Sequence, residues 1–194
     1  CVSLLVGLED IKKGAEGSPA KASLVENFPS VLETLRENKL PVTWSMVFGL
    51  DNHTPDTFLE AAAFIQEHKI DVNCHLIQPR HGTEFREKLI QQGRLVSDDS
   101  RQRDGVHLTY EPFRMTREQT LAGYIWLKDK INSSGFLAER FKSNYQVGGI
   151  RYASALASIG LAADWVTAQR MKRMYPELKS EIQKYERLWS GRKG

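Results

Sequence analysis

Residues 42–48, with the sequence VTWSMVF, form the stretch that decides the fold. β-Branched and aromatic residues dominate it and Pro41 precedes it, a pattern typical of a buried strand. Two similar apolar runs occur elsewhere, VSLLVGL at residues 2–8 and IDVNC at residues 70–74. The three runs predict three strands.

Helical patterns separate these strands. Within residues 27–38, apolar side chains recur at spacings of three and four, which predicts a helix. Thr54 and Pro55 open a second helix, as its cap and its first position. A repeated strand–helix order predicts a parallel sheet with right-handed crossovers. Residues 12–21, rich in Gly, Ala and Lys, predict a mobile loop.

The pattern weakens between residues 79 and 114. Residues 85–91 favour a short helix, while residues 97–105 are polar and charged. This segment is either an excursion over the strand ends or a disordered loop. Thr116 and Gln119 form a capping box for the next helix. The elements expected from there on are a helix at 116–133, a strand at 141–147, a helix at 152–159, a strand at 161–167 and a helix at 176–189.

These elements predict a single α/β domain over residues 1–194. Five or six parallel strands would make an open sheet or a partial (β/α) barrel, because a complete eightfold barrel typically needs ~250 residues. The chain opens without Met inside a strand-like run, so we expect residues to precede Cys1 in a longer protein.

Composition excludes several classes of protein. Apolar residues make up 41% of the chain and charged residues 26%, as in a globular domain. The formal charge of +3 is spread along the sequence, which argues against a nucleic-acid partner. No apolar run approaches the ~18 residues of a membrane span, so none is predicted. Two cysteines, Cys1 and Cys74, imply no disulfide framework.

Polar groups stand where two of the apolar runs end. Glu9 and Asp10 follow the first run, and His75 ends the run that begins at Ile70. At the carboxyl ends of barrel strands, such residues usually indicate chemistry rather than stability. Because side chains alternate along a strand, His75 should face away from Cys74. The sequence therefore predicts a site at these strand ends.

The segments around these strand ends resemble NodB-type polysaccharide deacetylases. Glu9-Asp10 is similar to that family's paired aspartates, and residues 71–76 are similar to its histidine motif. Residues 26–35 and 41–49 resemble its second helix–strand unit, and residues 148–165 its later segment. The similarity covers most of the chain in short pieces. The related chitooligosaccharide deacetylases are a close second match.

The resemblance implies a distorted or incomplete (β/α) barrel that hydrolyses N- or O-acetyl groups of a carbohydrate. It also implies a divalent metal, by preference zinc, held by one Asp and two His. By position, Asp10 would be a metal ligand and His75 the first histidine ligand. His81 would be the nearest second histidine, and Glu9 would be the general base.

Four further residues would contact the substrate in this interpretation. His53 follows the second strand at the predicted mouth, although its simpler role is the turn before Thr54. Arg151 corresponds loosely to the arginine of the family's later motif. Asp164 and Trp165 would line the pocket, where an aromatic ring can stack on a sugar, and Trp165 fits the core equally well.

The chain departs from the family pattern in four places. The arginine of the later motif is matched only loosely, by Gln146 or Arg151, and the late histidine strand that completes the family's site is not recognisable. Glu9 replaces an aspartate, so its carboxylate reaches one methylene further. The family's second histidine falls two or four residues after the first, where this chain has Ile77 and Pro79. Three alternatives stay open: a metal-dependent deacetylase, a metal-free carbohydrate-binding or scaffold relative, and a metal-free hydrolase with Cys1 as its nucleophile.

Overall fold

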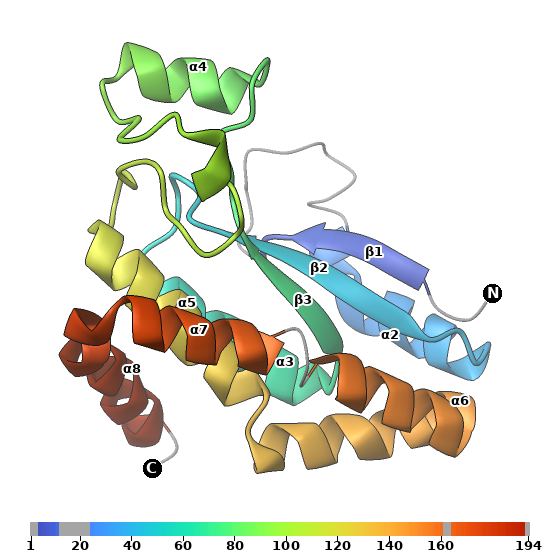
Figure 1. The fold of residues 1–194 in the computed structure, drawn as a ribbon. Coiled ribbons are helices and arrows are strands. Elements are labelled where there is room, and N and C mark those ends of the chain that lie inside the picture. Colours follow the sequence, from blue (N-terminus) through green and yellow to red (C-terminus); the bar gives the residue numbers. More distant parts are fainter. Residues whose placement is uncertain (1–3, 12–23, 161–163, 193–194) are drawn as a thin grey trace.

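A parallel sheet of three strands organises the chain. The computed structural model describes residues 4–11, 24–160 and 164–192, without the side chains of residues 156 and 158–160. The sheet has the order β1-β2-β3 (Figure 1). Its members are β1 (Leu4–Glu9), β2 (Val42–Phe48) and β3 (Asp71–Leu76). The α/β class, the parallel sheet and these three predicted strands are confirmed, while the loop expected at residues 12–21 lies outside the described residues.

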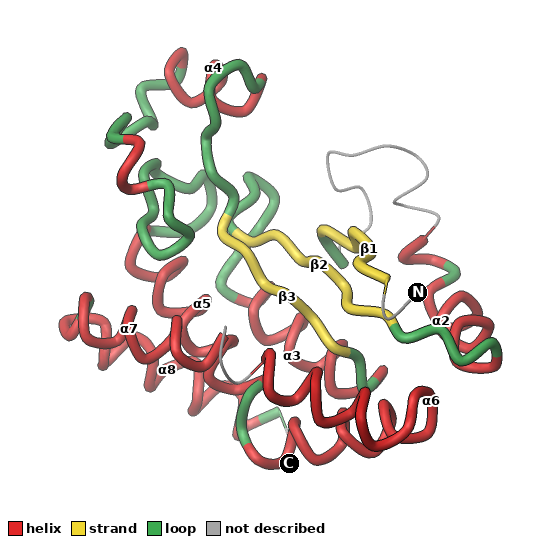
Figure 2. Tube along the Cα trace, turned by 45° about the vertical axis from the view of Figure 1, so that its right-hand side comes forward, coloured by secondary structure: helices red, strands yellow, loops and turns green. Residues whose placement is uncertain are grey.

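Two crossover helices, α2 (Phe28–Glu37) and α3 (Asp56–His68), cover one face of the sheet (Figure 2). The ring centroids of Phe28 and Trp44 lie 4.8 Å apart, and those of Phe58 and Phe48 lie 5.3 Å apart. Each strand is added on the same side of the previous one, so right-handed crossovers place both helices on the same face.

The opposite face of the sheet is called the open face below. It carries the residues that alternate with Trp44, Met46 and Phe48 on β2 and with Val72, Cys74 and Leu76 on β3. On this face Leu5 is 69% exposed, and His75 is exposed as well. The sheet therefore buries one face in the core and leaves polar and apolar side chains accessible on the other.

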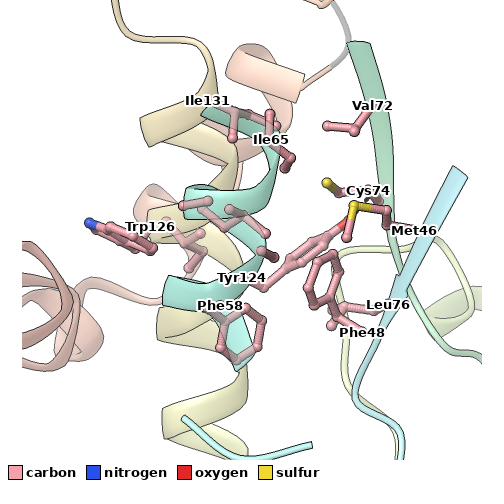
Figure 3. Close-up of a cluster of buried hydrophobic side chains, with 14 of the residues drawn as sticks. Met46, Phe48, Phe58, Ile65, Val72, Cys74, Leu76, Tyr124, Trp126 and Ile131 are labelled. Atoms are coloured by element: carbon pink, nitrogen blue, oxygen red, sulfur yellow. Dashed lines mark hydrogen bonds between the residues drawn. The ribbon is translucent and has the colours of Figure 1, made fainter. Parts of the chain in front are cut away.

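Helix α5 (Arg117–Ile131) packs beside α3 (Figure 3). Its predicted capping box between Thr116 and Gln119 is present. Side chains around its whole circumference are buried, as expected of a helix inside a core. The Tyr124 hydroxyl donates a hydrogen bond of 2.7 Å to the Cys74 carbonyl and so ties α5 to β3.

The remaining helices surround this core. The helices expected at 85–91, 152–159 and 176–189 are present, the last with a short 3-10 turn at its start. Their bounds are α4 (Glu84–Gln91), η1 (Ser100–Gln102), α6 (Ser134–Gly160, with a kink at Gly149), α7 (Val166–Met174), η3 (Pro176–Leu178) and α8 (Lys179–Gly191).

Two predicted strands are wrong. Residues 141–147 lie inside α6, where Phe136 and Arg140 are buried at a spacing of four and Asn144 donates to the Asp71 carboxylate. That helical spacing outweighs the strand-like composition of the run. Of the strand expected at 161–167, residues 161–163 lie outside the described part, and Val166 begins α7.

A strained residue ends α3. Lys69 has φ +52°, the left-handed conformation that glycine adopts without steric cost. We expect Lys69→Gly to raise the free energy of unfolding by about 0.5–1 kcal/mol, measured by urea denaturation. Lys69→Ala is the control. It removes the same exposed ion pair with Glu139 but keeps the Cβ, so it should not raise the free energy of unfolding. Equal stability of the two variants would refute strain at this position.

Candidate functional site

Glu9 ends β1 in a tight turn. The Asp10 amide donates to the Leu8 carbonyl at 2.9 Å, and Glu9 between them has φ +63°. This is the geometry of a γ-turn, which is strained for any residue except glycine. A bulge in the pairing of β1 with β2 falls at the same place, between Gly7 and Glu9. The turn sends the two neighbouring carboxylates in different directions.

The Glu9 carboxylate lies on the open face, above Gly7. A Cβ built on Gly7 would lie 2.5 Å from Glu9 Oε1, so any side chain at position 7 would displace the carboxylate. Gly7 pairs with Ser45, and Ser45 pairs with Asn73, across the three strands. The strained turn and the glycine together hold an acidic group over the accessible side of the sheet.

Asp10 turns into the protein instead. Its Oδ2 accepts a hydrogen bond of 2.8 Å from Asn52 and lies 3.2 Å from His53 Nε2, and both Asp10 and His53 are buried. The Gly49 amide donates to His53 Nδ1 at 3.3 Å. A ring nitrogen that accepts carries no proton in the neutral imidazole, so the proton lies on Nε2, beside Asp10. This cluster ties the end of β1 to the loop after β2.

His75 lies on the open face of β3, next to Val47 of β2. Partial burial and the nearby Lys128 ammonium lower its pKa below 6.5, while Asp164 and Glu9 act in the opposite direction. At pH 7 the imidazole is therefore neutral. Glu9 and His75 share one face at a separation of two strands, roughly 10 Å between their backbones.

Asp164 is buried and forms an ion pair with Lys128 of α5. The Lys128 ammonium also lies 5.1 Å from the centre of the Tyr124 ring. The pairing of this buried carboxylate connects the residues just before α7 to α5. Trp165 beside it is 45% exposed, so its ring is not part of the core.

His81 and Arg151 do not join the other predicted residues. His81 Nε2 lies 3.1 Å from Arg103 Nη2, and Arg103 also pairs with Asp98. Arg151 is exposed on α6, a helix that packs at the amino-terminal end of β3 through Asp71. Cys1, the alternative nucleophile, lies outside the described residues.

The segment 79–114 packs over the carboxyl ends of the strands. Arg94 and Lys88 pair with Asp51 at 2.7 and 2.9 Å. The buried Tyr110 hydroxyl donates to the Gly49 carbonyl at 2.7 Å. Gly49 has φ +93°, and a Cβ there would lie 2.2 Å from the Tyr110 oxygen, so this contact requires glycine. In the structure the segment lies over the carboxyl ends of the strands.

A pocket of about 480 Å³ opens between the open face and this excursion. Val47 and His75 contribute from the sheet, Gln78 and Arg80 from the segment after β3, and residues 103–105 from the excursion. Sequence reasoning identified only His75 among these residues. The polar run directly after β3 was a usable signal for Gln78 and Arg80, but the return of residues 103–105 to the sheet was not visible in the sequence.

The predicted metal ligands do not share a coordination shell in this arrangement. Asp10 contacts His53 and Asn52, His81 contacts Arg103, and His75 lies on the open face. Among the described residues, no three His, Cys, Asp or Glu side chains converge as metal ligands would. A ligating histidine normally donates its second N–H to an acceptor, whereas His53 Nδ1 faces a donor. The residues present do not fit the implied zinc.

Comparison with known proteins adds no family to this geometry. No protein-family profile matches the chain, and no curated protein matches it. Within the part of the chain that the structure describes, no helix combines the length and apolar character needed to cross a membrane.

The Asp10 cluster predicts a stability effect. Asp10→Ala leaves the Asn52 amide without its acceptor and removes the carboxylate that lies 3.2 Å from His53 Nε2, so we expect the free energy of unfolding to fall by about 1–3 kcal/mol. Urea denaturation with and without added zinc should give the same loss. An unchanged stability would contradict the pairing, and a zinc-dependent gain present only in the wild type would reveal a metal site.

Proposed function

We propose that the open face is a binding surface for a carbohydrate and that Glu9 and His75 contact it, without a metal. The position of Glu9 carries this proposal, because a strained turn holds its carboxylate above Gly7 on the face that His75 shares. A carboxylate and a neutral imidazole both accept hydrogen bonds, and sugar hydroxyls supply the donors. Strain of this kind concentrates at functional sites.

We further propose that the three strand–helix units form part of a distorted (β/α) barrel. In barrels of this type the strands follow one another in a single direction and all helices lie outside. The order β1-β2-β3, with α2 and α3 on one face, matches that rule. The open face would then be the barrel interior, where the loops after the strands surround a ligand.

A metal-dependent deacetylase is the second candidate. The observation in its favour is the buried contact of 3.2 Å between Asp10 and His53, close to the roughly 3.4 Å that separates two ligands of one tetrahedral zinc. The donor that faces His53 Nδ1 counts against it. Urea denaturation of the wild type and of Asp10→Ala, with and without zinc, distinguishes the two candidates. A stabilisation by zinc that only the wild type shows would favour the deacetylase.

Binding of chitotriose, a trimer of N-acetylglucosamine, tests the first candidate. We expect Glu9→Gln to weaken binding roughly tenfold, since it replaces a charge-assisted hydrogen bond with a neutral one. Gly7→Ala should weaken it as well, because a Cβ there displaces the carboxylate. Glu84→Gln, at an exposed position of α4, is the matched control. Isothermal titration calorimetry measures all four proteins, and equal affinities would refute the role of Glu9.

Acidification should weaken the same binding. Because burial and Lys128 lower the pKa of His75, the imidazole stays neutral at pH 7 and gains its proton only below pH 6.5. Once protonated, it can no longer accept from a sugar hydroxyl, so affinity should fall as the pH drops through that lowered pKa. His75→Gln should remove this step of the pH profile. A wild-type affinity that stays constant from pH 7.5 to 5 would contradict the assignment.

A further inference from the structure

The pocket beside His75 holds a combination of charges that the carbohydrate proposal does not use. Its volume, about 480 Å³, is typical of small-molecule sites. We propose that it binds the carboxylate of an acidic sugar, a uronic acid unit, with Arg80 as the cation and Gln78 as the acceptor for a neighbouring hydroxyl group. This inference rests on the carbohydrate function proposed above.

Arg80 supplies the charge. It lines the pocket and is exposed, and its guanidinium has no ion pair or hydrogen bond with another side chain among the described residues. The arginines around it are all engaged: Arg86 and Arg103 with Asp98, and Arg94 with Asp51. A planar guanidinium that is free to move presents two parallel N–H groups, which match the two oxygens of a carboxylate.

Gln78 supplies the second contact. Its Nε2 donates weakly to the His107 carbonyl at 3.4 Å, which directs the amide oxygen the other way. That oxygen, Oε1, is buried and has no hydrogen-bond partner among the described residues. An unsatisfied buried acceptor costs free energy, which a ligand hydroxyl donating to it would recover. An acidic sugar carries a carboxylate and hydroxyl groups within a few bonds of each other.

Among the described residues that line the pocket, Asp104 is the one carboxylate, and it is already paired. Its Oδ1 accepts from His107 Nδ1 at 2.9 Å and from the Val106 amide at 3.0 Å, and its Oδ2 lies 3.5 Å from Arg170. Arg103 also lines the pocket, and its Nη2 donates to Asp98 Oδ1 at 2.5 Å. With both of these residues paired, the net charge that the pocket offers a ligand is that of Arg80.

A titration with three small probes tests the inference. The full chain, labelled with ¹⁵N, is titrated at constant ionic strength with D-glucuronate, with its uncharged counterpart glucose, and with glycolate. We expect glucuronate to shift the amides of residues 77–80 and 103–105 and to bind at least tenfold more tightly than glucose. Arg80→Ala should remove that preference, and Arg80→Lys should keep part of it. Arg114→Ala, an exposed arginine outside the pocket, should change nothing.

The outcomes separate this inference from the function on which it rests. Equal binding of glucuronate and glucose, or glucuronate binding that survives Arg80→Ala, overturns the acidic-sugar site and leaves the carbohydrate surface standing. Glycolate that binds as well as glucuronate, in an Arg80-dependent way, supports the anion site and overturns the sugar as its ligand. The absence of shifts with all three probes at 50 mM overturns the pocket as a ligand site. Gln78→Leu, which removes the acceptor without removing a charge, should lower glucuronate affinity but weaken glycolate binding less than Arg80→Ala does.

Discussion

The structure depends on one constraint. When each strand of a parallel sheet is added on the same side of the previous one, right-handed crossovers place all the connecting helices on the same face of the sheet. The aromatic and sulfur-containing residues of β2 and β3 pack against α3 and α5 on that face. Burial of apolar surface in this layer stabilises the fold, at roughly 25 cal/mol per Å². The other face contributes little to that core, so its residues are free to serve a different purpose.

The end of β1 shows how closely core and site depend on each other. Because of the γ-turn at Glu9, the carboxylates of two adjacent residues lie in different places, one on the open face and the other inside the protein. Glu9 lies above Gly7 on the accessible side, while Asp10 joins His53 and Asn52 inside. The strain in the turn is offset by the buried contacts of Asp10, so the residue that stabilises the strand end is also the one that fixes where Glu9 points.

The elements that were predicted correctly are those determined by residues close together in the sequence. The β-branched run of β2, the proline at the start of α3 and the Thr116–Gln119 box all act within a few residues, and each marks an element that is present. Helix α3 begins one residue later than predicted, at Asp56, with Pro55 rather than Thr54 at the cap position. Residues 141–147 were wrongly predicted as a strand, because the few apolar side chains in this short run show no clear helical spacing. The contact of Asn144 with Asp71, which the helix makes possible, is not visible in the sequence. The pairing of Asp10 with His53 joins positions 43 residues apart. Both were expected at the strand ends, but only the fold reveals that they meet each other rather than His75 or His81.

Gly49 has a consequence for how the protein opens. Its carbonyl accepts from Tyr110, its amide donates to His53, and its α-carbon leaves no room for a side chain. The excursion, the loop after β2 and the Asp10 cluster thus meet at one peptide unit. Segments joined in this way exchange their amide protons together, as one cooperative unit, rather than fraying one at a time. We therefore expect residues 79–114 and the end of β1 to open together, so that a ligand that stabilises one of them also slows hydrogen exchange in the other.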